Sequence, residues 1–356
     1  MNEFIHTFSI ITYMTTEQRE QMSRCYGDDF YYDHVKQKWI FRRYADRGLR
    51  AEMEYTSYNE KKYNKKHGDI RAEWIITPAK LIFCGKPMAK LYTPYEYAEA
   101  CRQLQNLSDT IREECGVDLF EEAKLNRVDL TKDIQTPSEE YSREVIRLAK
   151  LALDKYGYRA WTAEEAEVYK EEWKDENAVF FRNHNQEVQT KIYNKIADLE
   201  LHGQDTSNLS GLIRFELTLK RKHMKKQGWI LEKYTCPAEL ADILNDILAH
   251  ASDSMRAHIT DPLWSGAMLS EKLQKKMIRC RCKSKAAKYK KMMEYRKICN
   301  SSKTFDTADN STAKRYFEEM GLSPLYTTDA VLYIPSFADL LMEREDERIR
   351  QFLRVH

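Results

Sequence analysis

The chain has 356 residues, enough for two domains, and hydrophobic residues at 42% can fill their cores. No run approaches the roughly 18 apolar residues of a membrane-spanning helix. The first residues lack a basic n-region, so they favour a first strand over a signal peptide. The formal net charge is only +2, but the positive charge is unevenly distributed.

The numbers of cysteines and aromatic residues indicate the cellular compartment and the kind of structure to expect. The eight cysteines include no C-x-x-C pair, so zinc-ligand spacing is absent. Scattered cysteines in a long chain without a secretory signal indicate the reducing cytoplasm. The 22 tyrosines suit sheets and also surfaces that stack on bases, and the sheet is the commoner explanation.

The first 94 residues are predicted to be rich in β-strands, followed by a helix. Aromatic and β-branched runs are broken by charged turns. The expected strands lie at 4–13, 29–34, 38–44, 50–58 and 71–83. Residues 95–115 then space Tyr97, Cys101 and Leu104 at helical intervals, and Gly116 is a natural end for this helix.

The next strand, 125–134, reads LNRVDLTKDI and mixes charges with apolar residues. Period two places Arg127 and Asp129 on one face, with Asp133 if the strand runs on. A helix follows, for which Ser138 is the N-cap candidate and Gly157 the end.

Two further strands with polar faces follow an acidic segment at 160–177, which is expected to be a loop or a short helix. Residues 178–200 are expected to form a hairpin, with residues 183–185 near its turn. In its second strand, KIYNK places Lys191, Tyr193 and Lys195 at one parity. The strand 212–222 alternates, with Arg214 and Glu216 on one face and apolar residues on the other.

Helical patterns replace strands after Pro237. Residues 272–297 hold 12 Lys or Arg against one acid, a density that indicates contact with a phosphate backbone, although a solvated helical face has the same appearance. This segment is called the basic block. Its predicted DNA-binding residues are Arg279, Arg281, Lys283, Lys285, Lys288, Lys290 and Lys291.

These patterns predict an α+β fold with mixed or antiparallel sheets and packed helices, followed by a mainly helical domain. The boundary is placed near residue 235. The expected domains are therefore 1–235, with the polar strands, and 236–356, with the basic block.

If the three polar strands are neighbours, their charged faces meet. Two carboxylates suit a hard cation such as Mg²⁺ or Mn²⁺. Arginines and lysines clamp phosphate oxygens, and a nearby tyrosine can attack a phosphodiester. Ordinary cross-strand ion pairs give the same pattern without any catalysis.

Three segments, taken in order, resemble the gene II/X family of replication-associated proteins of filamentous phages. They are LNRVDLTKDI, TKIYNKIADLE and LIRFELTLKRKHMKK, with TPAKLIFCGKP as a looser match ahead of them. The resemblance covers roughly residues 75–226. Plasmid replication-initiation factors of the trans-acting Rep type share the same general triplet.

The resemblance implies a rolling-circle replication initiator that nicks one strand at the origin and is held on the 5′ phosphate through tyrosine. Asp129 and Glu216 match the acidic positions and are the expected ligands of the divalent metal, with Asp133 as a further candidate. The catalytic candidates are Arg127, Arg214, Tyr193 and Lys195. Glu200 falls one position later than the acid of the family pattern.

The sequence departs from expectation at two points. It has no His-hydrophobe-His metal motif, and Tyr234 competes with Tyr193 as the nucleophile. The expected partners are origin DNA, host helicase and polymerase, and a second copy of the chain in a homodimer. Two alternatives stay open: a nucleic-acid-binding protein without catalysis, and a metal-dependent nuclease that activates water.

Overall fold

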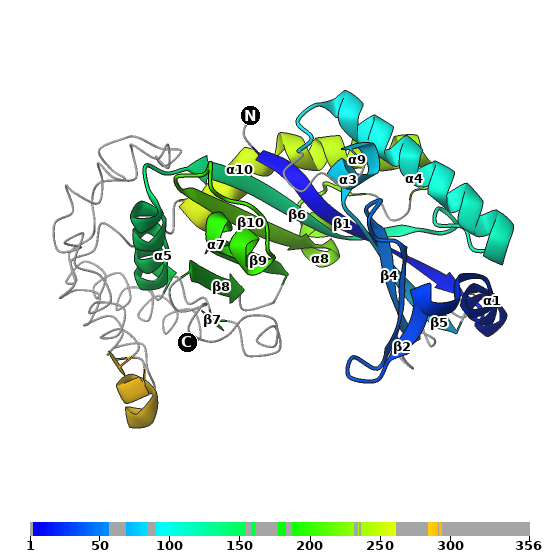
Figure 1. The fold of residues 1–356 in the computed structure, drawn as a ribbon, viewed down its shortest axis with the longest axis horizontal. Helices are drawn as coiled ribbons and strands as arrows, with labels where there is room; N and C mark the ends of the chain where they lie inside the picture. Colours follow the sequence, from blue (N-terminus) through cyan, green and yellow to red (C-terminus); the bar gives the residue numbers. More distant parts are fainter. Residues whose placement is uncertain are drawn as a thin grey trace, which may run out of the picture. The chain divides into compact units, whose positions relative to one another are not determined.

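The fold was analysed in a computed structural model of the chain (Figure 1). The structure describes residues 3–56, 69–83, 90–153, 159–160, 177–182, 187–230, 234, 236–260, 284–290 and 292–293. All structural statements below concern these residues.

The chain forms two compact units that are interleaved in the sequence. Unit 1 comprises Met1–Asp133, Asn185–Thr190 and Phe215–Met255, and unit 2 comprises Ile134–His184, Lys191–Arg214 and Arg256–His356. The strands β6 (Lys124–Gln135), β9 (Val188–Asn194) and β10 (Leu212–Lys220) contribute residues to both units.

Unit 1 is built on an antiparallel sheet with the strand order β2-β3-β4-β5-β1-β6-β10-β9. Its remaining strands are β1 (Glu3–Met14), β2 (Phe30–Asp33), β3 (Lys38–Tyr44), β4 (Leu49–Tyr55) and β5 (Ile70–Ile76). Ile10 pairs with Trp74 across β1 and β5, and both side chains are fully buried. Alternation along these strands therefore gives the sheet an apolar face.

Helices of unit 1 pack together and against the sheet (Figure 1). They are α1 (Thr16–Tyr26), α3 (Pro78–Phe83), α4 (Pro94–Cys115), α8 (Arg221–Lys226), α9 (Pro237–Ala249) and α10 (Ala251–Met255), with a short 3₁₀ turn, η1 (Gly27–Asp29). Tyr97 of α4 accepts a hydrogen bond from the Ile5 amide of β1 at 2.7 Å. Leu104 of α4 and Leu244 of α9 are fully buried, because α4 and α9 pack on each other.

Unit 2 contains the end of β6, parts of β9 and β10, and two further strands, β8 (Ala178–Arg182) and β7 (Arg159–Ala160). Its helical elements are α5 (Glu139–Leu153), α7 (Lys195–Leu201) and the π-helical η4 (Arg256–Thr260). The Thr136 amide donates to the Gly211 carbonyl at 3.1 Å, which ties the end of β6 to the start of β10.

The predicted fold class is confirmed at the level of a mixed α and β structure with an antiparallel sheet. The strands expected in the first 55 residues, the helix at 95–115 and the strand at 125–134 are all present. Gly116 ends α4 in a left-handed conformation with φ 69°, as a helix-ending glycine should. Ser138 caps α5 by accepting from the Tyr141 amide at 3.3 Å.

One expected strand is too long. Residues 71–83 form β5 only as far as Ile76, and α3 begins at Pro78. Proline favours the first position of a helix, because its φ suits the helix and its missing N–H is not needed there. The hydrogen bond from the Thr77 amide to the Gly48 carbonyl, at 2.8 Å, closes the strand just before the helix.

Two polar strands also end earlier than predicted, and this moves Lys195 off its strand. β9 stops at Asn194, whose side chain accepts from the amides of Ile196 and Ala197 and so starts α7 at Lys195. β10 stops at Lys220, and residues 221–226 form α8, which has no side-chain cap. Lys195 is therefore the first residue of a helix and not a strand neighbour of Tyr193.

The region after residue 235 is divided between the units. α9 and α10 belong to unit 1, whereas the sequence placed them in the second domain. Most of the remainder, residues 261–283 and 294–356, lies outside the described residues, so the helical C-terminal domain stays a prediction. No helix in the described part of the chain is long and apolar enough to cross a membrane.

Candidate functional site

A bulge in β6 determines which of its side chains share a face. Ser9 of β1 pairs with Arg127 and Ile10 pairs with Leu125, so Asn126 is an extra residue on β6. A bulge shifts the alternation of side chains along a strand. This shift explains why Leu125 is as buried as Val128, although the two differ in parity.

Arg127 and Asp129 share a face and form a two-point ion pair. Arg127 Nη2 lies 2.5 Å from Asp129 Oδ2, and Arg127 Nε lies 2.8 Å from Asp129 Oδ1. Thr218 of β10 donates to Asp129 Oδ1 at 2.6 Å. The Asp129 side chain is 6% exposed, so a buried carboxylate is held between two strands by directed hydrogen bonds from its neighbours.

Further carboxylates surround the Arg127 guanidinium. The charge of Asp129 raises the pKa of Arg127 above its ordinary value, and the charges of Glu73 and Glu216 add to this effect. Glu73 Oε1 accepts hydrogen bonds from Ser9 at 2.8 Å and from Asn126 at 3.0 Å. Residues from four strands therefore build one polar surface around Arg127, which is called the Arg127 cluster. Its members are Ser9 of β1, Glu73 of β5, Asn126, Arg127 and Asp129 of β6, and Glu216 and Thr218 of β10.

In this arrangement hydrogen bonds occupy most of the Asp129 carboxylate. Both of its oxygens accept hydrogen bonds from Arg127, and Thr218 takes a further lone pair. Among the described residues no group of three His, Cys, Asp or Glu is placed to hold a metal. The assignment of Asp129 and Glu216 as metal ligands stays a prediction.

Asp133, the third predicted ligand, is held by a different cation. Its Oδ2 lies 2.6 Å from Lys90 Nζ, and its side chain is 6% exposed. The neighbouring Lys132 pairs at 2.9 Å with Glu3, which also accepts from Ser252 at 3.0 Å. The Lys132–Glu3 pair and the Ser252 hydrogen bond connect the end of β6 to β1 and α10. The assignment of Asp133 as a metal ligand stays a prediction.

The other catalytic candidates lie in unit 2. Tyr193 is 9% exposed on β9, and Arg214 is 2% exposed on β10. Lys195 Nζ lies 5.8 Å from the centre of the Tyr193 ring and 2.5 Å from Asp198 Oδ2. The structure thus brings Tyr193 and Lys195 together, and the convergence of Tyr193 with Asp129 and Glu216 stays a prediction.

Tyr234, the alternative nucleophile, is enclosed in unit 1. It is 1% exposed, and its ring packs edge-to-face on Phe120 at 6.2 Å. Burial raises the pKa of the Tyr234 phenol well above its ordinary value. Formation of a phenolate at Tyr234 is therefore unfavourable in this conformation, which favours Tyr193 of the two.

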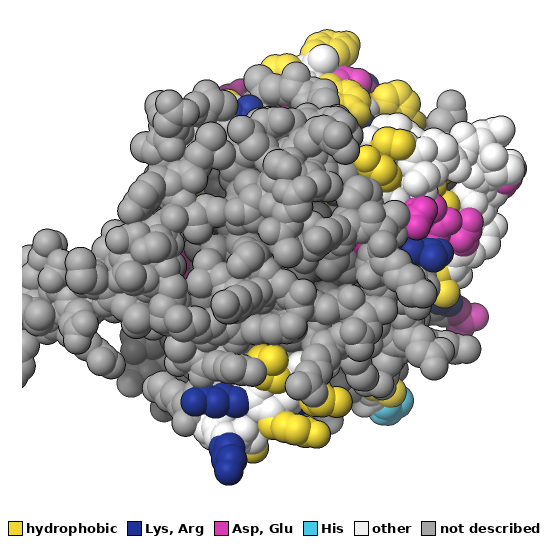
Figure 2. Space-filling model, turned by 90° about the vertical axis from the view of Figure 1, so that its left-hand side faces the viewer, with side chains coloured by type: hydrophobic (Ala, Val, Ile, Leu, Met, Phe, Trp, Pro, Cys, Tyr) yellow, Lys and Arg dark blue, Asp and Glu magenta, His cyan; other side chains and the backbone are white. Residues whose placement is uncertain are grey.

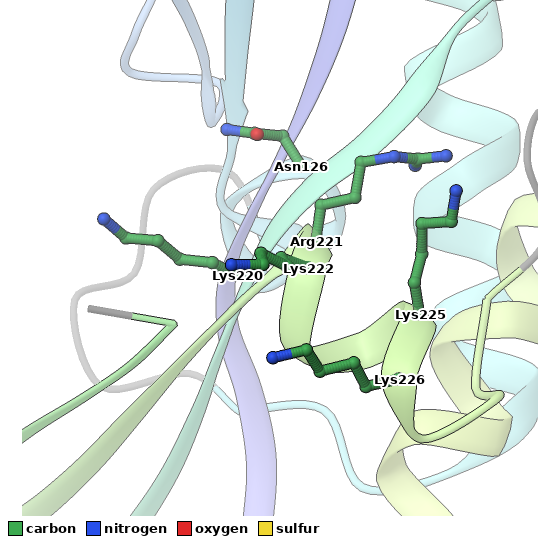
Figure 3. Close-up of a pocket in the computed structure, with 6 residues that line it drawn as sticks. All are labelled: Asn126, Lys220, Arg221, Lys222, Lys225 and Lys226. Carbon is green, nitrogen blue, oxygen red and sulfur yellow. The ribbon is translucent and has the colours of Figure 1, made fainter. Parts of the chain in front are cut away.

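A basic hollow lies where β10 passes into α8, and the sequence-based candidates did not include it. Figure 3 shows its lining, which combines Asn126 with five cations, Lys220, Arg221, Lys222, Lys225 and Lys226, around a volume of about 640 Å³. Lys220 and Lys226 extend to one side of α8, and Arg221 and Lys225 to the other. The positive charge is therefore spread over a broad surface.

Two anchors fix the orientation of α8. Glu187 accepts from Lys222 and Lys226, each at 2.8 Å, and these lysine side chains nevertheless remain 70% and 52% exposed. Arg221 donates to the Leu125 carbonyl of β6 at 2.8 Å. Because Asn126 both lines the hollow and donates to Glu73, the hollow adjoins the Arg127 cluster. The run KRKHMKK at 220–226 is the sequence signal that points to this surface.

Part of the basic block is also described. Residues 285–290 are helical and exposed, with Ser284 accepting from the Ala287 amide at 3.1 Å as the cap. This segment presents Lys285, Lys288 and Lys290 to solvent. Figure 2 shows Lys and Arg side chains beside hydrophobic ones at the lower edge of the face in view. Arg279, Arg281, Lys283 and Lys291 lie outside the described residues.

Comparison with known proteins adds no assignment. No protein family and no curated protein matches the chain. The resemblance to phage replication proteins therefore depends on the order of the three motifs.

Proposed function

We propose that the chain is a DNA-binding replication protein of the rolling-circle type, and that the basic hollow at α8 contacts the phosphate backbone. The observation that carries the DNA-binding part of this proposal is the set of five Lys and Arg residues around one hollow. The rolling-circle part depends on the resemblance of the three motifs. Lysine and arginine neutralise phosphates and release counterions, which supplies most of the affinity in sequence-independent DNA binding.

The spread of the cations around the hollow supports DNA as the ligand rather than a small anion. Its cations point to both sides of α8, which suits successive phosphates of a polymer (Figure 3). Glu187 restrains Lys222 and Lys226 without burying them, so their ammonium groups reach a bound phosphate from fixed positions. The exposed lysines of helix 285–290 supply a second basic surface.

Strand nicking by Tyr193 is the second candidate, and the Lys195 ammonium beside the Tyr193 ring favours it. In this reaction the phenol oxygen forms a bond to the scissile phosphorus. The bond from phosphorus to the 3′ oxygen breaks, and the phenol proton is passed to solvent while the 3′ oxygen gains one. A positioned cation stabilises the charge that develops on the phosphoryl oxygens.

A single set of assays separates binding from nicking. The full chain is incubated with supercoiled plasmid carrying its replication origin, with and without Mg²⁺, and nicked DNA and protein–DNA adduct are measured beside a mobility-shift assay. We expect adduct with the wild type and with Tyr234→Phe, and none with Tyr193→Phe. Glu216→Gln should still shift the DNA while losing cleavage.

Each outcome has a defined meaning. A DNA shift without adduct in every variant leaves the binding function and removes nicking. Nicked DNA without adduct indicates a nuclease that activates water. Absence of any shift with the wild type contradicts the proposed function as a whole.

A further inference from the structure

An exposed row of aromatic side chains crosses three strands of unit 1, far along the sheet order from β10. The aromatic ladder consists of Tyr32 on β2, Trp39 on β3 and Tyr55 on β4. The ring centres of Tyr32 and Trp39 are 5.2 Å apart, and those of Trp39 and Tyr55 are 5.0 Å apart. Tyr32 is 38% exposed and Tyr55 is 63% exposed.

The ladder is not part of the hydrophobic core. Phe41 lies two residues after Trp39 on β3, and Met53 lies two residues before Tyr55 on β4, so each shares a face of the sheet with the ladder. Phe41 and Met53 are fully buried, and the ladder is therefore the exposed end of the same apolar face. Single exposed aromatic residues are common on proteins, but several in contact form a patch that marks an interaction surface.

The ring geometry leaves surfaces open for stacking. The Tyr32–Trp39 and Trp39–Tyr55 contacts are edge-to-face, at 63° and 79°. Such a contact occupies at most one face of a ring, so Tyr55, which is 63% exposed, still presents an aromatic face. Tyr32, which is 38% exposed, has a second edge-to-face contact, with His34 at 5.0 Å between the ring centres. Nucleobases stack on aromatic faces, and they are accessible for stacking in single strands.

Positive charge lies close to the ladder. The Arg19 guanidinium of α1 lies 5.0 Å from the centre of the Trp39 ring. Arginine over an aromatic ring also offers a planar surface to a base.

We infer that the aromatic ladder is a stacking platform for single-stranded DNA. The inference rests on the proposed function only for the choice of DNA as the polymer. Tyr32 and Tyr55 stack on bases, and the Arg19 guanidinium beside Trp39 adds positive charge to the platform. Stacking recognises the base plane, so the platform binds single strands with little sequence preference. In a replication protein it would hold the strand that is separated from its complement.

The test measures binding of a fluorescent oligo(dT) of about 15 nucleotides, a length that spans such a platform, to the full chain without divalent metal. Tyr32→Ala/Tyr55→Ala should weaken binding about tenfold, the loss expected when stacking on aromatic side chains is removed. Tyr32→Phe/Tyr55→Phe keeps the ring faces and should bind like the wild type. The control is Tyr95→Ala, which removes a tyrosine that is 79% exposed on α4.

The outcomes separate the inference from the proposed function. The inference is overturned if Tyr32→Ala/Tyr55→Ala binds oligo(dT) with the same affinity as the wild type. It is also overturned if the wild type binds oligo(U) more tightly than oligo(dT). If the double alanine variant has a lower melting temperature but unchanged oligo(dT) affinity, the aromatic rings stabilise the β2–β4 strands and do not bind DNA. If plasmid nicking fails but the alanine pair loses oligo(dT) binding, the platform stands and the nicking candidate does not.

Discussion

Arg127 and Asp129, two residues apart on β6, face the same side of the sheet and form a two-point ion pair that Thr218 of β10 completes. Such a pair is costly to break, because removal of one partner leaves the other charge poorly solvated. The pair therefore holds β6 and β10 in a fixed relation beside the basic hollow.

Replacement of Asp129 by asparagine tests this role. We expect Asp129→Asn to lower the free energy of unfolding by about 1–2 kcal/mol, since the half-buried Arg127 keeps some contact with water. Urea unfolding measures the change. Asp109→Asn breaks the exposed pair between Asp109 and Arg112 on α4 and should cost less than about 0.5 kcal/mol. Equal decreases in the free energy of unfolding in the two variants would show that the Arg127–Asp129 pair stabilises the fold no more than an exposed ion pair does.

The basic hollow predicts a salt-dependent contribution to DNA binding. Lys220→Gln/Lys225→Gln should weaken binding to any DNA sequence and reduce the slope of log K against log salt by about two, one unit for each phosphate that is no longer neutralised. Fluorescence anisotropy at several salt concentrations gives the slope. Lys80→Gln/Arg102→Gln removes two charges from other helices of unit 1 and should leave it unchanged. An unaltered slope in the α8 variant would rule out the hollow as a surface that binds the DNA backbone.

The basic block predicts a second, separate contribution. Neutralisation of Lys285, Lys288 and Lys290 to glutamine should weaken binding across sequences and flatten the salt dependence. If this variant and the α8 variant act on different phosphates, their effects on log K add. If the triple variant binds DNA with wild-type affinity, helix 285–290 is an ordinary solvent-exposed helix that does not contact DNA.

Glu187 predicts a pH-dependent stability. Hydrogen bonds from Lys222 and Lys226 lower the pKa of Glu187 below its ordinary value of 4.5. A folded pKa below the unfolded value stabilises the protein above the unfolded pKa, and this stabilisation is lost as pH falls through the folded value. We therefore expect Glu187→Gln to be less stable than the wild type at about pH 6, with the difference shrinking towards about pH 3. A pH-independent difference in urea unfolding would contradict this.

Gly48 predicts a local steric limit where β4 begins. Its φ is +90°, and an added Cβ would lie 2.6 Å from the carbonyl oxygen of Thr77, the residue between β5 and α3. Gly48→Ala should cost about 3 kcal/mol, combining backbone strain with the clash. Gly116→Ala is the control, because Gly116 has φ +69° and open space around it, so only the strain of about 1 kcal/mol applies. Similar losses in thermal or urea unfolding would show that the clash is relieved by local movement.

The sequence predicts most elements but not their local breaks. Strands with regular alternation and the capped α4 are located within a few residues, because their signals are local. The bulge at Asn126 depends on pairing with β1, about 120 residues away in the chain, and no local pattern shows it. The start of α7 is visible in principle, since Asn194 is a good N-cap, but the alternation in KIYNK favours a longer strand.

The candidate site is predicted in part. The alternation correctly places Arg127 and Asp129 on one face, but their mutual pairing, which occupies the carboxylate, is a matter of side-chain geometry. Glu73 is not among the candidates, because its approach to Arg127 arises from the order β5-β1-β6 in the sheet. The α8 cations belong to the motif LIRFELTLKRKHMKK, and only the helix at 221–226 shows that they form one surface.

The interleaving of the two units limits how the chain can be divided. Leu240, Leu244 and Ile247 of α9 are buried in unit 1, next to α4, although more than 120 residues separate the two helices in the sequence. A fragment that stops before Pro237 would leave the apolar side of α4 open to water. Unit 1 can therefore complete its core only after residues 134–184 and 191–214 of unit 2 have been synthesised, so no single cut in the polypeptide separates the two units.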